Sequence, residues 1–338
     1  MMETDKEIYK QIFTAIDRSK HVMLVMHKRP DGDTAGSCLA MAHYLDVIKK
    51  SHTCFCIDEL PGNLHFLPGK EKVSTDIAHW QPEKAQFDLL IVFDAGDLKY
   101  SGIADYVDML SHNFTIINID HHTTNAHFGN HNLVVTTASS TCEIVHDLLH
   151  SINALNKHMA TCLLTGLMTD TGGFTNLATS ASAVSAASKL LAKGANMQNI
   201  TKRVFQNRSI ATLKLWGRAL ERLRANSSGI VITIITQKDL EECGAPEEAI
   251  NGVANFLNSL DDQIDAKAVL VLSEIEKGMI KGSFRTTHPL IDVSKFAMLL
   301  GGGGHKKAAG FTICGQLKHA QGQWSIEPLT TTHVYNKK

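Results

Sequence analysis

The chain lacks the features that mark secreted and membrane proteins. Among its 338 residues, no apolar run approaches the roughly 18–20 residues that a membrane-spanning helix needs. The N-terminus carries acids at Glu3, Asp5 and Glu7 and no apolar signal segment. The seven cysteines are an odd number without a Cys-x-x-Cys pair, which favours reduced thiols over a disulfide framework. We therefore expect a soluble, cytoplasmic protein with no membrane partner.

The chain also has little net charge and few aromatic residues. Its formal net charge of −1 excludes a strongly basic, histone-like protein but leaves local basic patches open. Aromatic residues make up 6%, which is little for a protein that binds long single strands by stacking their bases. With 43% hydrophobic and 20% charged residues, the composition is that of a globular protein, and the length indicates about two domains.

What the chain does have is a repeated pattern in which polar groups follow short apolar runs. The runs at 21–26, 88–93 and 114–119 predict strands of a parallel sheet that is covered on both faces. The run at 160–168 predicts a buried helix, and two glycines in 170–174 predict a sharp turn after it. The acids and histidines that follow the four runs are His27, Asp31, Asp33, Asp94, Asp120, His121, His122 and Asp170.

These acids and histidines are expected to meet at one place. In an open α/β sheet, ligands gather outside the carboxyl ends of the strands. A cluster of carboxylates and imidazoles there would repel itself without a cation. Imidazole with carboxylate suits Mn, Fe, Co or Zn, and oxygen-rich sites also admit Mg. The sequence therefore predicts a metal site with enough ligands for two ions.

Two helix starts are expected beside this site. Either Asp33 or Thr34 can cap a helix that runs through Leu39 to Ile48, and this would place the preceding loop at a helix N-terminus that favours anions. Ser140 and Glu143 have the spacing of a capping box and predict a second helix start.

A second domain is expected from about residue 227. Its predicted strands are 229–235, 266–272 and 279–285, and its predicted helices are about 246–259 and 292–300. Before it, from 202 to 224, positive charges outnumber the single acid Glu221. Either a solvated helix face or a basic wall for an anionic substrate explains this run. The positive residues are Lys202, Arg203, Arg208, Lys214, Arg218, Arg222 and Arg224.

Four consecutive glycines at 301–304 weaken both helix and strand. We therefore expect a loop whose backbone N–H groups approach an anion, with a flexible hinge as the alternative. His305 follows the glycines directly, and Arg285 ends a predicted strand. Arginine suits phosphate because its planar fork meets the oxygens bidentately.

Together these motifs resemble the DHH phosphoesterase family, named for the Asp-His-His at 120–122. The segment 301–310 resembles the family's DHHA1 substrate-binding module, and the motifs span about residues 20–315. The resemblance implies an α/β protein with a mostly parallel, helix-flanked sheet in its first domain. The implied organisation is a DHH metal-binding domain at 1–194, a helical connector at 195–226, a smaller α/β DHHA1 domain at 227–316 and a tail at 317–338.

The resemblance also implies roles for the polar residues. Two Mn²⁺ ions per site would be held, with Mg²⁺ or Co²⁺ as substitutes. Asp120 would orient a neighbouring imidazole, and His122 would touch the scissile phosphate. Asp97 is a weaker ligand candidate, and many relatives place an arginine where this chain has Tyr100. The implied ligands are His27, Asp31 and Asp94 for one ion, and Asp33, Asp94, His121 and Asp170 for the other.

The implied substrates are small. The short two-domain organisation is similar to bacterial oligoribonucleases that also act as 3′-phosphoadenosine-5′-phosphate (pAp) phosphatases. We therefore expect hydrolysis of short RNA and dinucleotides to mononucleotides and dephosphorylation of pAp-like nucleotides, by water activated between two metals; a homodimer is also expected. The residues implied to hold the substrate's other phosphate are Arg285, Gly302, Gly303, Gly304 and His305.

Three alternatives stay open. A single-strand exonuclease of the RecJ type would need a continuous basic groove and a further domain. A family II inorganic pyrophosphatase shares the catalytic half but lacks the glycine-histidine segment. A non-catalytic nucleotide- or RNA-binding module would not need the complete set of metal ligands.

Overall fold

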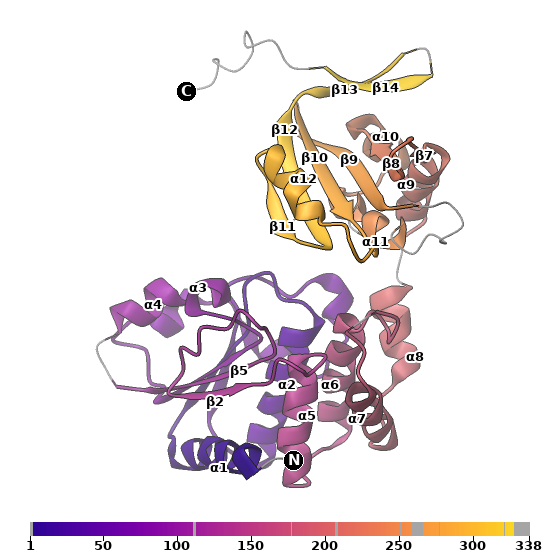
Figure 1. Cartoon of the computed structure of the whole chain (residues 1–338). Coiled ribbons are helices and arrows are strands. Elements are labelled where there is room, and N and C mark those ends of the chain that lie inside the picture. Colours follow the sequence, from indigo (N-terminus) through magenta and orange to yellow (C-terminus); the bar gives the residue numbers. More distant parts are fainter. Residues whose placement is uncertain are drawn as a thin grey trace. The chain divides into compact units, whose positions relative to one another are not determined.

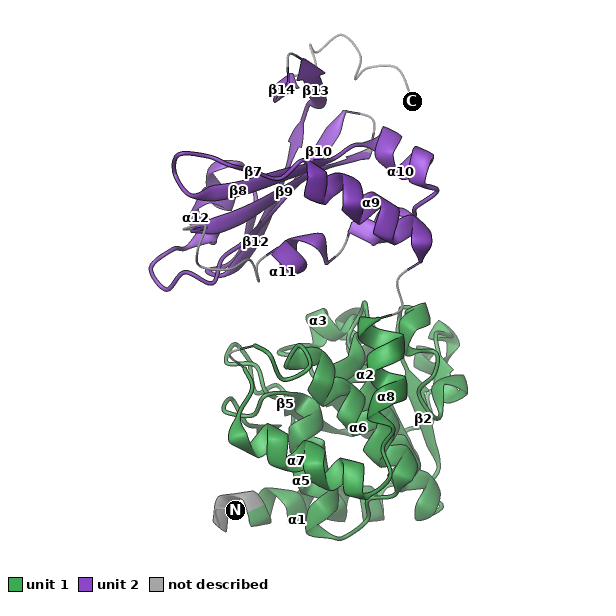
Figure 2. Cartoon of the chain, turned by 90° about the vertical axis from the view of Figure 1, so that its right-hand side faces the viewer, with its two compact units in different colours: residues 1–207 green, residues 208–338 purple. Residues whose placement is uncertain are grey.

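The computed structural model describes residues 3–110, 113–176, 178–206, 209–250, 252–257, 266–276, 278–320 and 322–327. The chain forms two compact units, unit 1 (1–207) and unit 2 (208–338), and the division falls inside the expected connector (Figures 1 and 2). Both units are α/β, as the sequence predicts. Within the described residues, no helix has the length and apolar character that crossing a lipid bilayer requires.

Unit 1 is built on a six-stranded parallel sheet with the order β3-β2-β1-β4-β5-β6, which confirms the predicted parallel sheet. The chain runs outward from β1 in one direction and returns to place β4 on its other side. Ligands of open α/β sheets bind at this kind of reversal, outside the carboxyl ends of the strands. The strands are β1 (Val22–Val25), β2 (His52–Phe55), β3 (Val73–Ser74), β4 (Leu89–Phe93), β5 (Thr115–Asp120) and β6 (His131–Val134).

Both faces of this sheet are buried because its strands are apolar at successive positions. Val22 and Leu24 pack into one core with the long helices, while Met23 and Val25 pack into a second core around Trp80. The helices of the first core are α1 (Glu3–Arg18), α2 (Gly32–Val47), α5 (Thr141–Ser151), α6 (Lys157–Asp170) and α7 (Ala181–Ala192). The remaining helical segments of unit 1 are η1 (Gly62–Leu64), η2 (Lys70–Lys72), η3 (Ile77–Trp80), α3 (Leu98–Ser101), α4 (Ala104–Met109), α8 (Met197–Ile200) and the π-helix η4 (Thr201–Phe205).

The start of α2 corrects the predicted cap. Asp31, not Asp33 or Thr34, is the N-cap, because its carboxylate accepts the N–H groups of Asp33 and Thr34. The helix therefore begins at Gly32, and Asp33 lies in its first turn. Gly166 lets α6 approach closely here, since a Cβ on it would lie 2.8 Å from the Cα of Asp33.

The predicted start of α5 is confirmed, with a variation. The hydroxyl of Ser140 accepts the N–H of Glu143, as in a capping box. The Glu143 carboxylate accepts the N–H of Ser139 instead of returning to that of Ser140. The N–H groups of Ser139 and Glu143 therefore both have hydrogen-bond acceptors, which fixes the loop that precedes α5.

Unit 2 contains a six-stranded mixed sheet with the order β11-β12-β10-β9-β8-β7, in which only β8 and β9 pair in parallel among the described strands. Helices α9, α10 and α11 cover one face and α12 packs on the other. The strands are β7 (Arg224–Ala225), β8 (Ile230–Ile235), β9 (Ala268–Glu276), β10 (Met279–Arg285), β11 (Gly303–His305) and β12 (Ala308–Cys314). The helices are α9 (Ile210–Glu221), α10 (Gln237–Cys243), η5 (Glu247–Ile250), α11 (Val253–Leu257) and α12 (Val293–Leu299).

Two predictions for unit 2 need correction. The expected helix at 246–259 is divided into η5 and α11, and its positions 251, 258 and 259 lie outside the described residues, as does Arg208. The expected glycine loop is wrong for Gly303 and Gly304, which form β11 with His305 and pair with β12. The glycines serve close backbone approach: a Cβ on Gly302 would lie 2.1 Å from the carbonyl oxygen of Gly310.

The expected tail also carries structure. Strands β13 (Gln316–Ala320) and β14 (Gln323–Glu327) form an antiparallel hairpin beyond β12 (Figure 1). The N–H of Leu317 donates to a carboxylate oxygen of Glu274 in β9, which attaches the hairpin to the sheet. The rest of the tail, 328–338, lies outside the described residues.

Candidate metal centre

The polar residues that follow β1, β4 and β5 lie together at the carboxyl end of the unit 1 sheet. Asp94 directly follows β4 and is central, because acids and histidines from both neighbouring strands surround it. Its backbone has φ of 57°, a left-handed conformation that is unfavourable outside glycine and is found often at functional sites. The turn directs the side chain into the cluster, where only 3% of the residue is exposed.

One group of donors joins His27, Asp31 and Asp94. The Nε2 atom of His27 lies 3.4 Å from a carboxylate oxygen of Asp94 and 3.7 Å from one of Asp31. The other ring nitrogen, Nδ1, is 2.9 Å from the carbonyl oxygen of Lys28 and donates to it. Nε2 therefore faces the acids, and it is the nitrogen that would bind a metal after giving up its proton.

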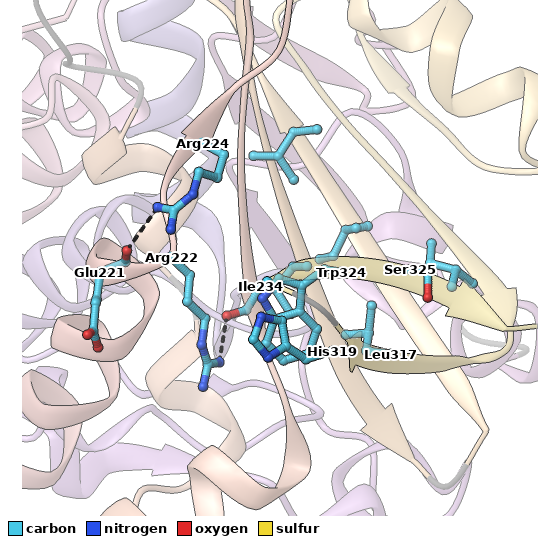
Figure 3. A pocket seen from close by; sticks show the side chains of 12 residues that line it. Glu221, Arg222, Arg224, Ile234, Leu317, His319, Trp324 and Ser325 are labelled. Atoms are coloured by element: carbon cyan, nitrogen blue, oxygen red, sulfur yellow. Dashed lines mark hydrogen bonds between the residues drawn. The ribbon is translucent and has the colours of Figure 1, made fainter.

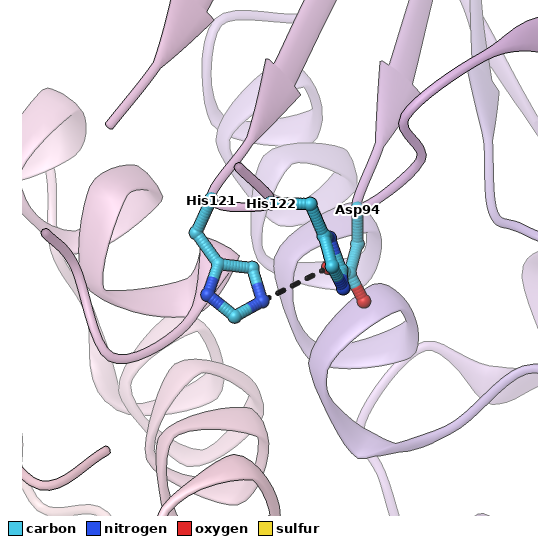
Figure 4. A group of neighbouring side chains, drawn as sticks. All are labelled: Asp94, His121 and His122. Atoms are coloured by element: carbon cyan, nitrogen blue, oxygen red, sulfur yellow. Dashed lines mark ion pairs between the residues drawn. The ribbon is translucent and has the colours of Figure 1, made fainter. Parts of the chain in front are cut away.

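A second group joins Asp33, His121 and Asp170. The Nε2 atom of His121 lies 3.3 Å from Asp170 and 3.9 Å from Asp33. It is also 3.6 Å from Asp94, and a third group joins Asp94, His121 and His122 (Figure 4). Within each group the possible ligand atoms all lie within 4.8 Å of one another, and Asp94 and His121 each belong to two groups. The six residues predicted as metal ligands are therefore brought together.

The cluster carries acids that the protein's own groups neutralise only in part. Burial acts to lower the pKa of His27, but Asp31 and Asp94 outweigh this and raise it to about 11. Within the described ranges, only histidines form ion pairs with Asp33, Asp94 and Asp170. Burial, together with the neighbouring carboxylates of Asp33 and Asp94, raises the pKa of Asp170 to about 10. Burial also raises the pKa of Asp33 well above its usual range, and the charge of Asp94 adds to it. A divalent cation would remove this repulsion, so the donor set fits a metal.

Backbone and hydroxyl groups of α5 fix two of the acids. The N–H groups of Thr141 and Cys142 donate to the two oxygens of Asp33, at 2.6 and 2.8 Å. The hydroxyl of Thr141 donates to Asp94 at 3.0 Å. The carboxylates are thus held in place before any metal binds, which lowers the cost of ordering them.

Asp120 and His122 form a neighbouring pair. The Nδ1 atom of His122 lies 2.8 Å from a carboxylate oxygen of Asp120, whose other oxygen accepts from the side-chain amide of Asn125 at 2.6 Å. The hydrogen bond to Asp120 raises the pKa of His122 above its ordinary value although burial opposes it. Asp120 is fully buried, while the His122 side chain is 45% exposed beside Asp94.

Sequence reasoning missed Thr141, Asn125 and the position of Tyr100. A Ser-Thr pair at a helix start and an asparagine soon after Asp-His-His are signals that could have found the first two. The centre of the Tyr100 ring lies 5.1 Å from that of His27, and Tyr100 is exposed. Asp97 is in neither ligand group; its carboxylate caps α3 by accepting the N–H of Tyr100.

Unit 2 places three of the predicted substrate residues around one cavity. Arg285, Gly303 and Gly304 line this hollow of about 600 Å³, together with residues of β9 and η5. We call it the Arg285 cavity. The Arg285 guanidinium donates to the carbonyl oxygen of Phe284, and burial lowers its pKa from the ordinary value. Gly302 is outside the lining, and His305 lies exposed on β11.

Comparisons with known proteins agree with this geometry. The chain is 28% identical over 295 residues to the bifunctional oligoribonuclease and PAP phosphatase NrnA of Thermus thermophilus, a match that covers 87% of this chain and 84% of the relative. It is 26% identical to the cyclic-di-AMP phosphodiesterase PdeA of Listeria monocytogenes, over 86% of this chain and 44% of that protein. The solved structure of an exopolyphosphatase-related protein from Bacteroides fragilis is similar with a TM-score of 0.82 and 26% identity, covering 92% of each chain.

The family models match both units. Residues 21–167 match the N-terminal domain of the DHH family, and residues 217–322 match the DHHA1 domain. These ranges contain every predicted metal ligand except Asp170, which lies three residues past the first, and every predicted substrate residue. The chain therefore belongs to the DHH/DHHA1 family and is a phosphoesterase, a hydrolase that acts on phosphoester bonds.

Proposed function

We propose that this protein is a Mn²⁺-dependent phosphoesterase that hydrolyses short oligoribonucleotides to mononucleotides and dephosphorylates pAp-like nucleotides. The observation that carries the proposal is the set of three overlapping donor groups, two of which share Asp94. Two groups that share a carboxylate suit a two-ion centre, and mixed imidazole and carboxylate donors suit Mn²⁺. The similarity to NrnA supports the choice of short RNA and pAp as substrates.

In this proposal, His27, Asp31 and Asp94 hold one ion, and Asp33, Asp94, His121 and Asp170 hold the other. Bound cations would stabilise charge on the phosphoryl oxygens and lower the pKa of an attacking water. The protein's own groups position what reacts. Asp120 holds His122 by its Nδ1 atom, which directs the opposite ring nitrogen of an exposed side chain toward a substrate phosphate.

The Arg285 cavity would bind a second phosphate of the substrate. A planar guanidinium and the backbone of Gly303 and Gly304 provide donors for phosphate oxygens without a bulky side chain between them. We include Gly302 and His305 in this role, since they flank the same backbone. A requirement for a phosphate away from the reacting one would select nucleotides over simple phosphoesters.

Dinucleotide hydrolysis is a second candidate because of the similarity to PdeA. A linear dinucleotide such as pApA offers both a scissile phosphodiester and a second phosphate, so it makes the same demands on the two sites. A cyclic dinucleotide has no terminal phosphate. Comparing cyclic di-AMP with pApA therefore tests whether a terminal phosphate is needed.

The test is a Mn²⁺-dependent time course with products resolved by chromatography. The substrates are pAp, pApA, cyclic di-AMP, an RNA of about 5 nucleotides and one of about 24, which exceeds the roughly 4–16 nucleotides that one single-strand-binding fold covers. We expect turnover of pAp, pApA and the shorter RNA and little of the longer one. Efficient degradation of the longer RNA would replace the proposal with an exonuclease, and binding without turnover would replace it with a non-catalytic module.

A substitution tests the role of the Arg285 cavity. We expect Arg285→Ala to lower kcat/KM for pAp and pApA by about tenfold or more, because a bidentate phosphate contact is lost. Hydrolysis of a generic aryl phosphodiester, which has no second phosphate, should change little. Lys295→Gln removes an exposed positive charge outside the cavity and is the matched control. Equal losses on both kinds of substrate would exclude this role for Arg285.

We also propose a cytoplasmic, homodimeric protein. All seven cysteines are free thiols, and five of them are buried, as suits a reducing compartment. The homodimer rests on the family resemblance, and sedimentation equilibrium of the full chain tests it.

A further inference from the structure

Unit 2 contains a second cavity, of about 1000 Å³, under the C-terminal hairpin (Figure 3). We call it the hairpin cavity. Leu272 of β9 lines it, whereas the adjacent residues Val271 and Ser273 line the Arg285 cavity. Because successive side chains of a strand point to opposite faces, the two cavities lie on opposite faces of the same sheet. The hairpin cavity is therefore distinct from the proposed substrate site.

The floor of the hairpin cavity is aliphatic and rigid. Ile232 and Ile234 of β8 and Leu272 of β9 provide it from the sheet, and Leu317 closes it from the hairpin. Leu272 and Leu317 are 7% and 8% exposed, so the floor is part of the packed core of unit 2. A flat apolar floor of this kind accommodates a planar ring and not a hydrated ion.

One wall is formed by three planar groups that lie against one another. The ring centres of His319 and Trp324 lie 4.8 Å apart with their planes tilted by 33°, and the guanidinium of Arg222 lies 5.1 Å from the Trp324 ring centre (Figure 3). Arg222 is also bound by the carboxylate of Asp239 and by the carbonyl oxygen of Ile234. Arg222 therefore fixes the wall, and its charge is compensated by Asp239.

A second arginine provides positive charge that is not compensated in this way. Arg224 is exposed and lines the cavity, and its guanidinium donates to the carbonyl oxygens of Glu221 and Leu223. Among the described residues, no carboxylate forms an ion pair with it. The Glu221 carboxylate points away from the Arg224 guanidinium (Figure 3). An anion at this edge would gain a charge-assisted hydrogen bond.

We propose that the hairpin cavity is a second nucleotide-binding site, which takes a base against its aliphatic floor and aromatic wall and a phosphate on Arg224. The aromatic wall and the apolar floor suit the base of a nucleoside monophosphate, and the uncompensated guanidinium suits its phosphate. The volume is at the upper end of the range for small-molecule sites, about 300–1000 Å³. The same chemistry occurs in a free mononucleotide and in one residue of an RNA strand. We expect the ligand to be one residue of an RNA strand, and this expectation rests on the proposed function.

The test counts nucleotide sites on the full chain in EDTA, where turnover cannot occur. AMP and an RNA of about 5 nucleotides are titrated by calorimetry into the wild type, Arg224→Gln, Trp324→Leu and Arg285→Ala. We expect two AMP sites in the wild type. One should weaken by about tenfold in Arg224→Gln and in Trp324→Leu, because a phosphate contact or a stacking surface is lost, and the other should weaken in Arg285→Ala. Lys318→Gln is the matched control, since Lys318 is an exposed residue of the same hairpin that pairs with Glu327 outside the cavity.

Each result decides the proposal. A single AMP site that only Arg285→Ala weakens would overturn it, as would equal effects of Arg224→Gln and Lys318→Gln. If Trp324→Leu instead abolished self-association without changing AMP binding, the cavity would be an interface between two copies of the chain. RNA that binds more tightly than AMP, and loses that advantage in Arg224→Gln, identifies a strand as the source; equal affinities identify the free nucleotide. Because these measurements need no catalysis, they can fail while Mn²⁺-dependent hydrolysis succeeds, and the reverse also holds.

Discussion

Buried acids in the two units differ in the charged groups that surround them. In unit 2, Asp239 is 2% exposed and is paired with the guanidinium groups of Arg218 and Arg222. In unit 1, Asp33 and Asp94 are equally buried, but their neighbours are other acids and histidines. Asp239 has its counter-ions within the chain, whereas the unit 1 cluster requires a cation from outside. The difference separates an acid with counter-ions inside the fold from acids that are candidate metal ligands.

The pKa directions express the same contrast. For Asp239, burial acts to raise the pKa, but hydrogen bonds from Arg222 and its neighbours outweigh this and lower it below the usual range. Because that pKa is lowered on folding, its contribution to stability is present at neutral pH and is lost as pH falls below about 4. For Asp170, burial and the neighbouring acids outweigh the charge of His27, and its pKa is raised. Charge on Asp239 favours the folded state, and charge on Asp33 and Asp170 opposes it until a cation is bound.

The largest expected effect comes from Asp94→Asn. This substitution keeps the shape and tolerates the left-handed backbone, but it removes the charge of a carboxylate that belongs to two of the three donor groups. We expect Mn²⁺-dependent hydrolysis of an aryl phosphodiester to fall at least about a thousandfold, since several kcal/mol of transition-state stabilisation is lost. The unfolding temperature in EDTA should stay the same or rise. Substantial remaining activity would exclude Asp94 as a shared ligand.

Asp239→Asn should give the opposite result. We expect a loss of about 3–5 kcal/mol in the stability of unit 2, because two arginines lose their buried counter-charge. Urea unfolding followed by tryptophan fluorescence measures this, while hydrolysis of an aryl phosphodiester by the folded protein should persist. Glu242→Gln is the control, since Glu242 is an exposed partner of Arg218 and should leave stability unchanged. A stability loss no greater than that of Glu242→Gln would show that Asp239 does not stabilise unit 2 through its charge.

Metal addition should stabilise unit 1 selectively. A ligand at about 100 times its Kd adds roughly 2.7 kcal/mol to the folded state. We therefore expect Mn²⁺ to raise the unfolding temperature of the wild type and to have little effect on Asp94→Asn, as measured by calorimetry with and without EDTA. A shift of equal size in both proteins would show that the cation binds somewhere other than this cluster.

The smallest effect is expected from two neighbouring glycines of unit 2. A Cβ on Gly302 would meet the backbone of Gly310 at 2.1 Å, whereas a Cβ on Gly303 would meet nothing within 4 Å. Gly302→Ala should therefore cost about 1–3 kcal/mol through overpacking, and Gly303→Ala should cost little. Urea midpoints of the two variants test this. Similar costs would mean that the glycines serve flexibility and not close approach.

The sequence predicted the three central strands of each sheet, β1, β4 and β5 in unit 1 and β8, β9 and β10 in unit 2, because of their apolar runs. The outer strands of both sheets were not among the strand ranges predicted from these runs. The sequence also predicted the metal cluster, since acids and histidines after such runs must gather at one sheet edge. The cap at Asp31 was mispredicted because three polar residues, Asp31, Asp33 and Thr34, each have the chemistry of a cap. Gly303 and Gly304 were mispredicted as loop, because local propensity cannot show that a neighbouring strand, β12, pairs with them.

The sequence by itself determined the α/β class, the parallel sheet of unit 1 and which acids and histidines are the candidate metal ligands, since these follow from periodicity and residue chemistry. Only the tertiary structure decided which carboxylate oxygens of the cluster face which histidine nitrogens. It also decided that Thr141 and Asn125 donate hydrogen bonds to acids of the cluster. In unit 2 it decided that the charge of Arg222 is compensated by Asp239, whereas Arg224 has no such partner among the described residues. The hairpin cavity likewise exists only in three dimensions. Its wall joins Arg222 to His319 and Trp324, about a hundred residues further along the chain, and no local pattern encodes that contact.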